Sequence, residues 1–188
     1  MKYASLDLET TCLEDRSPKN ILMVSIVVED PKNPMPLKEL PHFTAFVRYP
    51  TVSGEAYALA MNAWILDIIS GRKPNETGYE IYNQGDWIKP ANDFLTKHFG
   101  DQDGRIFCAG KNVGTFDFGF LPDALRKRFS FRVIDPAMKF TDLLNDDKIA
   151  NLETCKKRAG LEPVVSHDAR EDALDVIATL RPTYGKVY

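Results

Sequence analysis

The chain has 188 residues, 44% of them hydrophobic, which is enough to fill the core of one domain without a disulfide or a structural metal. Its net charge of −3 argues against a protein that coats duplex nucleic acid by neutralising phosphates. Its three cysteines are far apart, which excludes a zinc ribbon and favours a reducing, cytoplasmic setting. We expect a single domain over residues 1–188, with no apolar run long enough to span a membrane.

The N-terminal quarter of the chain predicts strands. Residues 3–8 read as one strand, and residues 21–29 as a longer and more buried one. Three prolines between positions 30 and 36 end that run in a turn or loop. Residues 42–48 alternate enough to form a third strand beside the second, so the first three strands are expected to be antiparallel.

From residue 55 onward, apolar residues recur at helical spacing. They predict a helix over residues 55–70, followed by a polar loop to Gln84. Further elements are expected in this order: a helix between Trp87 and Phe99, a strand over 105–109, a helix over 118–129, a strand over 131–134, helical material within 143–159 and a helix over 169–180. This order predicts an α/β fold, with a mixed five-stranded sheet flanked by helices.

Asp7 and Glu9 fall on one face of the first predicted strand, because side chains alternate along a strand. Two carboxylates on one face repel each other and raise each other's pKa values. A divalent cation between them would remove that cost. For these two residues alone, an edge strand with a solvated polar face is the favoured alternative.

Asp172 lies on the apolar stripe of the last predicted helix, between Ala169 and Ala173. An acid on the inner face of a helix is rarely tolerated unless it is paired or binds a metal. No lysine or arginine shares the stripe, so a metal is the simplest partner. The other acids of this region lie outside the stripe and are expected to be exposed: Asp168, Glu171 and Asp175.

Two further residues fit a site around these carboxylates. His167 lies just before the last helix, where its titration range suits a base that takes a proton from water. Asp117 follows a glycine-punctuated turn between a strand and a helix, a place where loops carry function. The alternatives are a surface or capping histidine, and a helix acid favoured by the helix dipole.

Together these residues resemble the DEDDh exonuclease family, whose members have a ribonuclease H-like fold. The matching motifs are Asp7-Leu8-Glu9-Thr10-Thr11, Asn112-x-x-x-Phe116-Asp117 and His167-x-x-x-x-Asp172. They stand in the family's order and are spread over nearly the whole chain. A sister subgroup has tyrosine at the position of Asp168, so the histidine version is the one present. Cys12 departs from the family pattern, because many relatives have glycine there.

The resemblance implies a 3′→5′ exonuclease that releases nucleoside 5′-monophosphates. The four carboxylates of Asp7, Glu9, Asp117 and Asp172 would bind two magnesium or manganese ions, and His167 would deprotonate the attacking water. All-oxygen ligand sets suit these hard cations. The expected partner is the 3′ end of single-stranded DNA or RNA, with no role for a membrane.

The resemblance also suggests which residues bind the terminal nucleotide. Leu13 and Phe116 would contact the base, and Thr10 and Asn112 would position the sugar and backbone. Core packing is an equal alternative for Leu13 and Phe116. The basic runs 126–128 and 156–158 are expected to be solvated helix faces rather than a track for the strand.

Two other functions fit the same sequence. One is a nucleic-acid-binding or assembly module that has lost catalysis, although all five catalytic positions are present. The other is a hydrolase of small phosphodiesters or dinucleotides. The sequence does not distinguish DNA from RNA, because it contains no identifiable reader of the 2′-hydroxyl group.

Overall fold

A computed structural model describes residues 1–185 and contains one six-stranded mixed sheet in the order β4-β3-β2-β1-β5-β6. β1 pairs antiparallel with β2 and β2 with β3, whereas β4 lies parallel to β3, β5 to β1 and β6 to β5. The strands are β1 (Tyr3–Thr10), β2 (Ile21–Glu29), β3 (His42–Arg48), β4 (Glu80–Asn83), β5 (Ile106–Ala109) and β6 (Phe129–Ile134). The predicted α/β fold with three antiparallel N-terminal strands is confirmed.

The predicted number of five strands is wrong, because β4 forms in a segment that was expected to be a loop. This strand has four residues and pairs with β3 from Ala45↔Glu80 to Arg48↔Asn83. So short a segment shows little alternation in the sequence. Its pairing depends on the neighbouring strand rather than on a local signal.

Eight α-helices cover the sheet or extend its edges within residues 1–185. They are α1 (Ala56–Met61), α2 (Ala63–Ile69), α3 (Ile88–Phe99), α4 (Asp117–Phe120), α5 (Asp123–Arg126), α6 (Ala137–Phe140), α7 (Leu152–Arg158) and α8 (Ala169–Leu180). Three short 3₁₀ turns accompany them: η1 (Pro18–Asn20), η2 (Leu37–Glu39) and η3 (Arg181–Thr183). None of the helices in this described range is long and apolar enough to cross a membrane.

Three predicted helices are shorter or divided in the structure. The helix expected over residues 55–70 breaks at Asn62 into α1 and α2. The helix expected over 118–129 becomes α4 and α5, because Pro122 cannot donate a backbone hydrogen bond and restricts Leu121 to an extended conformation. Helical material in 143–159 is confined to α7, which Asn151 caps by accepting a hydrogen bond from the Thr154 amide at 2.9 Å.

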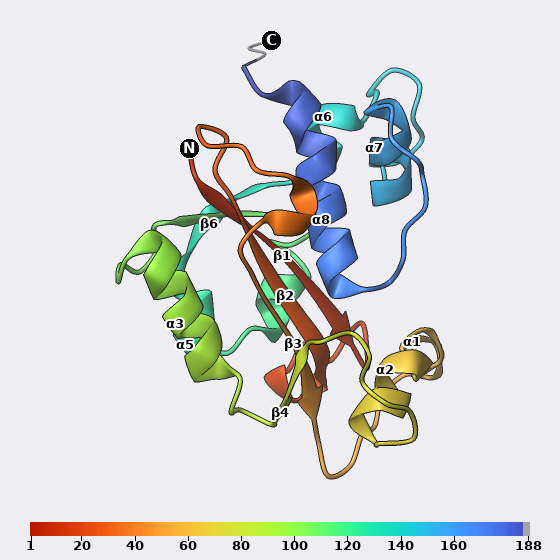
Figure 1. The fold of residues 1–188 in the computed structure, drawn as a ribbon. Helices are drawn as coiled ribbons and strands as arrows, with labels where there is room; N and C mark the ends of the chain where they lie inside the picture. Colours follow the sequence, from red (N-terminus) through yellow and green to blue (C-terminus); the bar gives the residue numbers. More distant parts are fainter. Residues whose placement is uncertain (186–188) are drawn as a thin grey trace.

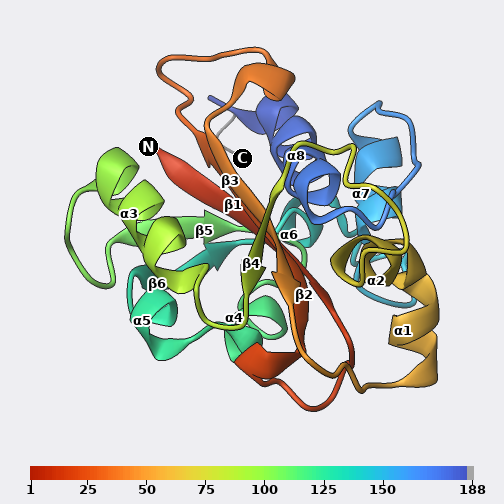
Figure 2. The ribbon, with the colours of Figure 1, turned by 60° about the horizontal axis from the view of Figure 1, so that its bottom comes forward.

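The two faces of the sheet are covered by different helices. α8 packs on β1 and β2 on one face, while α3 and α5 lie on the other, as both views of the ribbon show (Figures 1 and 2). Along β1, Ala4, Leu6 and Leu8 join the core on the α3 side, and Tyr3 joins the core under α8. The alternation of a strand therefore places Asp7 and Glu9 on the face that α8 covers.

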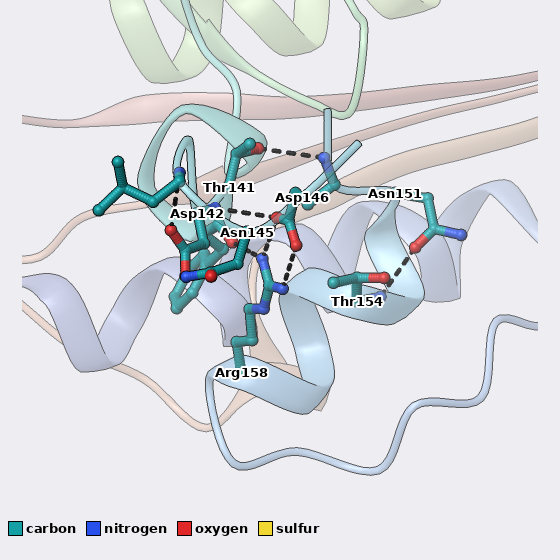
Figure 3. Close-up of polar contacts among 10 residues, drawn as sticks. Thr141, Asp142, Asn145, Asp146, Asn151, Thr154 and Arg158 are labelled. Atoms are coloured by element: carbon teal, nitrogen blue, oxygen red, sulfur yellow. Dashed lines mark hydrogen bonds and ion pairs between the residues drawn. The ribbon is translucent and has the colours of Figure 1, made fainter. Parts of the chain in front are cut away.

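The segment between α6 and α7 is held by polar contacts (Figure 3). Arg158 donates two hydrogen bonds to the carboxylate of Asp146, and a third to the Phe140 carbonyl at 2.6 Å. Lys156, two residues earlier, is buried and pairs with Asp175 of α8. The expectation of a solvated basic face at 156–158 is therefore wrong for Lys156, whereas Arg158 is exposed and still forms an ion pair. Asp175 is only partly exposed.

The basic run 126–128 also has a structural role. Arg128 is only 1% exposed, and its guanidinium donates to the Asn92 side chain, to Thr96 Oγ1 at 3.1 Å and to the Gly100 carbonyl at 2.6 Å. These contacts tie the start of β6 to the end of α3. The sequence pattern did not reveal this, because every one of these partners lies in a distant segment.

Candidate active site

The carboxylates of Asp7 and Glu9 meet the first turn of α8. β1 ends where α8 begins, so the C-terminal half of the strand lies beside the N-terminus of the helix (Figure 1). Asp172 lies in the first turn of α8 on its buried side, as its place on the apolar stripe predicted. Glu9 is also buried, while Asp7 is partly exposed. Three of the predicted acids thus come from two elements that pack directly on each other.

His167 lies in the short turn that leads into α8. Its φ of 53° is in the left-handed region, which a non-glycine residue adopts at a cost. The turn is fixed on both sides: Asp168 caps α8 by accepting hydrogen bonds from the amides of Arg170 and Glu171, and Ser166 donates to Asp172. The His167 ring consequently has a nitrogen within 4.8 Å of carboxylate oxygens of Glu9 and Asp172.

Asp117 reaches the same acids from a third segment, the turn between β5 and α4. Gly110 makes the close approach possible, because a Cβ atom at this position would lie 2.8 Å from the Leu6 carbonyl oxygen of β1. β5 pairs with β1 only as far as Ser5, and beyond that point the Leu8 amide donates to the buried Asp117 carboxylate. The fourth predicted acid therefore lies against β1.

Asn112 stabilises this turn through backbone hydrogen bonds. Its φ is 59°, and its carbonyl accepts hydrogen bonds from the amides of Thr115 and Phe116 at 3.0 and 2.9 Å. Its own amide donates to Asp135 Oδ2 at 2.9 Å. Within residues 1–185, Asn112 and His167 are the only non-glycine residues with positive φ, and both belong to the predicted site.

The electrostatics of the four acids reflect their proximity. Burial, together with the charges of Asp117, Asp172 and Glu9, raises the pKa of Asp7 well above its usual value. Burial also raises the pKa of Asp117. Burial and the charge of Asp172 raise the pKa of Glu9 to about 8, and burial raises the pKa of Asp172 to about 6. Four carboxylates that disfavour one another's ionised forms need a compensating positive charge at neutral pH.

The donor set fits a divalent cation. Glu9, His167 and Asp172 can each offer one ligand atom within 4.8 Å of the others. Asp7 lies close enough to Glu9, Asp172 and Asp117 for their charges to raise its pKa. Carboxylate oxygens are the ligands that magnesium and manganese prefer. The structure also brings His167 into ligand range, although the sequence suggested it only as a base.

Three of the acids, Asp7, Glu9 and Asp172, line a cleft of about 180 Å³. Of the predicted substrate-binding residues, Thr10, Leu13 and Phe116 line it, whereas Asn112 does not. The predicted metal-binding residue Asp117 does not line it either. Leu13 is 45% exposed, so at this position the core-packing alternative is wrong. Phe116 packs partly against the core and partly lines the cleft. The cleft is lined by Asp7, Leu8, Glu9, Thr10, Leu13, Tyr57, Ala58, Met61, Asn62, Phe116, His167 and Asp172.

α1 supplies three lining residues that were absent from the predicted site, and Asn62, directly after α1, is a fourth. Tyr57 and Asn62 are the most informative of these. Tyr57 is 66% exposed, and the buried Asn62 donates from Nδ2 to the Thr10 carbonyl at 3.0 Å. The Asn62 amide also bonds to Glu9 and partly opposes the rise in the pKa of that acid. A signal for Asn62 is present in the sequence, because Ala58, Asn62, Ile65 and Ile69 recur at helical spacing and are all buried. An asparagine on such a buried stripe indicates a polar partner.

No protein-family model matches the sequence, and a search of curated proteins finds no match. Solved structures do match. The zinc-bound form of the E. coli ExoI–ssDNA complex superposes with a TM-score of 0.64 at 14% identity over 97% of this chain. The cell-death related nuclease 4 (CRN-4) gives 0.62 at 13% identity over 97%. A 3′-exonuclease that recognises the 3′ end of the histone mRNA stem-loop gives 0.55 at 12% identity over 97%.

The matched structures are longer than this chain. The chain spans 40% of the ExoI chain, 63% of the CRN-4 chain and 80% of the histone mRNA exonuclease chain. At these identities the likeness concerns the path of the backbone, and it extends over nearly all of the described residues. The chain therefore has the ribonuclease H-like fold that these nucleases share.

Proposed function

We propose that this chain is a metal-dependent 3′→5′ exonuclease that removes nucleoside 5′-monophosphates from single-stranded DNA or RNA. The observation that carries the proposal is a cleft lined by the carboxylates of Asp7, Glu9 and Asp172 beside the His167 imidazole, with the buried Asp117 carboxylate close enough for its charge to act on Asp7. The shared fold supports it, since ExoI is described in complex with ssDNA and the histone mRNA enzyme in recognition of a 3′ end.

Asp7, Glu9, Asp117 and Asp172 would hold two magnesium or manganese ions. When bound, such ions supply positive charge that stabilises the attacking and leaving oxygens of an in-line displacement at phosphorus. The carboxylates themselves fix where that charge is placed, and Asn62 orients Glu9 through its side-chain amide. The raised pKa values of Asp7 and Glu9 support this assignment, because a bound cation would offset the burial and mutual repulsion that raise them.

His167 would act as the general base. Its side chain is exposed at the rim of the cleft, so the imidazole can take a proton from the attacking water and release it to solvent. The charge of the nearby His167 ring partly opposes the rise in the pKa of Asp172 that burial causes. Attack of the water oxygen on the terminal phosphorus would expel the 3′ oxygen of the shortened strand, which gains a proton.

The apolar walls of the cleft suit a nucleobase. Leu13, Tyr57 and Phe116 line it from three different segments. Stacking on such side chains contributes about 1–3 kcal/mol per base and tolerates any sequence, which is what trimming requires. Thr10 donates its hydroxyl proton to the Cys12 carbonyl at 2.8 Å, so towards a sugar it would act as an acceptor. Asn112 would approach the strand from outside the cleft.

The test is release of mononucleotides from a single strand carrying a label at its 3′ end, in Mg²⁺ or Mn²⁺ and in EDTA. Metal-dependent release of the labelled 5′-monophosphate supports the proposal. Binding of the strand without any product would instead indicate an inactive binding module. Substrates of graded length add a second outcome: hydrolysis confined to dinucleotides would indicate a small-phosphodiester hydrolase.

A further inference from the structure

The loop that carries Leu13 is attached to the rest of the cleft on two opposite sides. We call residues 11–17, between β1 and η1, the Leu13 loop. Leu13 lines the cleft together with Tyr57 at the start of α1 and Phe116 just before α4. An exposed loop of this kind is normally mobile. Its motion would vary the spacing of Leu13 from Tyr57 and Phe116, the three side chains that form the slot for the base.

Glu55 makes the attachment on the α1 side. One oxygen of its carboxylate, Oε1, accepts hydrogen bonds from the amides of Leu13 at 2.9 Å and Glu14 at 3.3 Å. The Glu55 amide donates to the Thr11 carbonyl at 2.8 Å. Glu55 directly precedes α1, and Tyr57 is the second residue of that helix. The contacts of Glu55 therefore hold Leu13 at a set distance from Tyr57.

Arg16 makes the attachment on the α4 side. Its guanidinium donates to the Thr115 carbonyl and lies 5.6 Å from the centre of the Phe116 ring. The stem of the side chain crosses Gly119 so closely that a Cβ atom there would lie 2.7 Å from Arg16 Cδ. The far end of the Leu13 loop is therefore held against the segment that presents Phe116.

We propose that Glu55 and Arg16 are positioning residues that hold Leu13 at a set spacing between Tyr57 and Phe116, so that the slot for the terminal base exists before the strand arrives. This inference rests on the proposed nuclease function. Neither residue lines the cleft, and neither is among the groups that shift the pKa values of the four acids. Without either attachment, the nucleic-acid strand would have to order the loop when it binds. The affinity for the strand would then fall more than the rate of the chemical step.

The expected signature is a split between KM and kcat. In Glu55→Ala and Arg16→Ala, KM for a single-stranded oligonucleotide should rise about tenfold, the loss expected when one stacked base is poorly held, with kcat changed by less than about threefold. Glu55→Gln should behave like wild type, because an amide oxygen can still accept from both backbone amides. Gly119→Ala should resemble Arg16→Ala, because the added methyl group displaces the Arg16 side chain.

The experiment measures kcat, KM and the melting temperature of these four variants, with Glu14→Ala as a control that removes a carboxylate from the same loop but keeps its backbone amide. Raised KM in Glu55→Ala, Arg16→Ala and Gly119→Ala, with Glu55→Gln and Glu14→Ala near wild type, supports the inference. An active wild type whose KM is unchanged in Glu55→Ala and Arg16→Ala overturns the inference alone. A wild type that hydrolyses no oligonucleotide overturns the proposed function and this inference with it.

Discussion

Glu9 at the end of β1 and Asp172 in the first turn of α8 present carboxylate oxygens within 4.8 Å of each other. Both side chains are buried, and the charge of Asp172 contributes to raising the pKa of Glu9 to about 8. Packing alone does not account for such a pair, since two adjacent buried carboxylates cost stability when both are ionised. We infer that this pair is retained for function, although it destabilises the metal-free protein.

Substitution of Asp7 by asparagine should separate activity from stability. Activity should fall by about 10²–10³-fold, because the variant loses the carboxylate on which the charges of Glu9, Asp117 and Asp172 all act. In EDTA at pH 8 the melting temperature should rise, because one repelling charge disappears. The two measurements are a nuclease assay and a thermal melt. A variant that keeps near-normal turnover would remove Asp7 from the site.

Substitution of His167 by alanine should lower kcat by about 10²–10⁴-fold, the usual contribution of a general base. The four carboxylates remain, so binding of Mn²⁺ should persist and still raise the melting temperature. If the variant loses Mn²⁺ binding as well as activity, His167 acts as a ligand, a role that its ring nitrogen is close enough to play.

The stability of the metal-free protein should fall as the pH rises. Glu9 has a pKa of about 8 and Asp172 of about 6 in the folded protein, compared with ordinary values near 4. In the window from about pH 4.5 to 8 the folded state keeps protons that the unfolded chain has released, so each rise in pH favours unfolding. Melting temperatures in EDTA at pH 5, 6.5 and 8 test this sign.

Added Mg²⁺ or Mn²⁺ should reverse this trend, and the gain in melting temperature should be larger at pH 8 than at pH 5, because cations bind the ionised carboxylates. Asp7→Asn should reduce the gain. An equal effect of metal at both pH values, or one unaffected by Asp7→Asn, would place metal binding elsewhere on the protein.

The ion pair between Glu29 and Arg181 should matter for stability rather than activity. Glu29 is fully buried, and Arg181 donates to its Oε2 at 2.7 Å and to the Met35 carbonyl at 2.7 Å. Arg181→Ala leaves an unpaired buried carboxylate and should cost about 3 kcal/mol in the free energy of unfolding.

Two variants complete the test of this ion pair. The double variant with Glu29→Gln should be less destabilised, since no buried charge is left behind. Lys89→Ala is the matched control, because it breaks the exposed pair with Asp93 and should cost about 0.5 kcal/mol or less. Chemical denaturation measures all three, and equal losses from Arg181→Ala and Lys89→Ala would contradict the assignment.

The parts of the structure that the sequence predicted are those with a strong local signal. Asp7 and Glu9 follow from strand alternation, and Asp172 follows from its place on the stripe of a long helix. Asn62 was missed because one helix was expected over residues 55–70, whereas the structure breaks it at this residue. β4 and the burial of Arg128 depend on partners from distant segments, which no local pattern contains.

The most direct test of the central claim is a crystal structure of the protein soaked in Mn²⁺, with data collected to show the anomalous signal of manganese. We expect two anomalous peaks within coordinating distance of the carboxylates of Asp7, Glu9, Asp117 and Asp172, with the ring of His167 beside them. Ordered manganese at other acidic residues, with none among these four at millimolar concentration, would contradict the account.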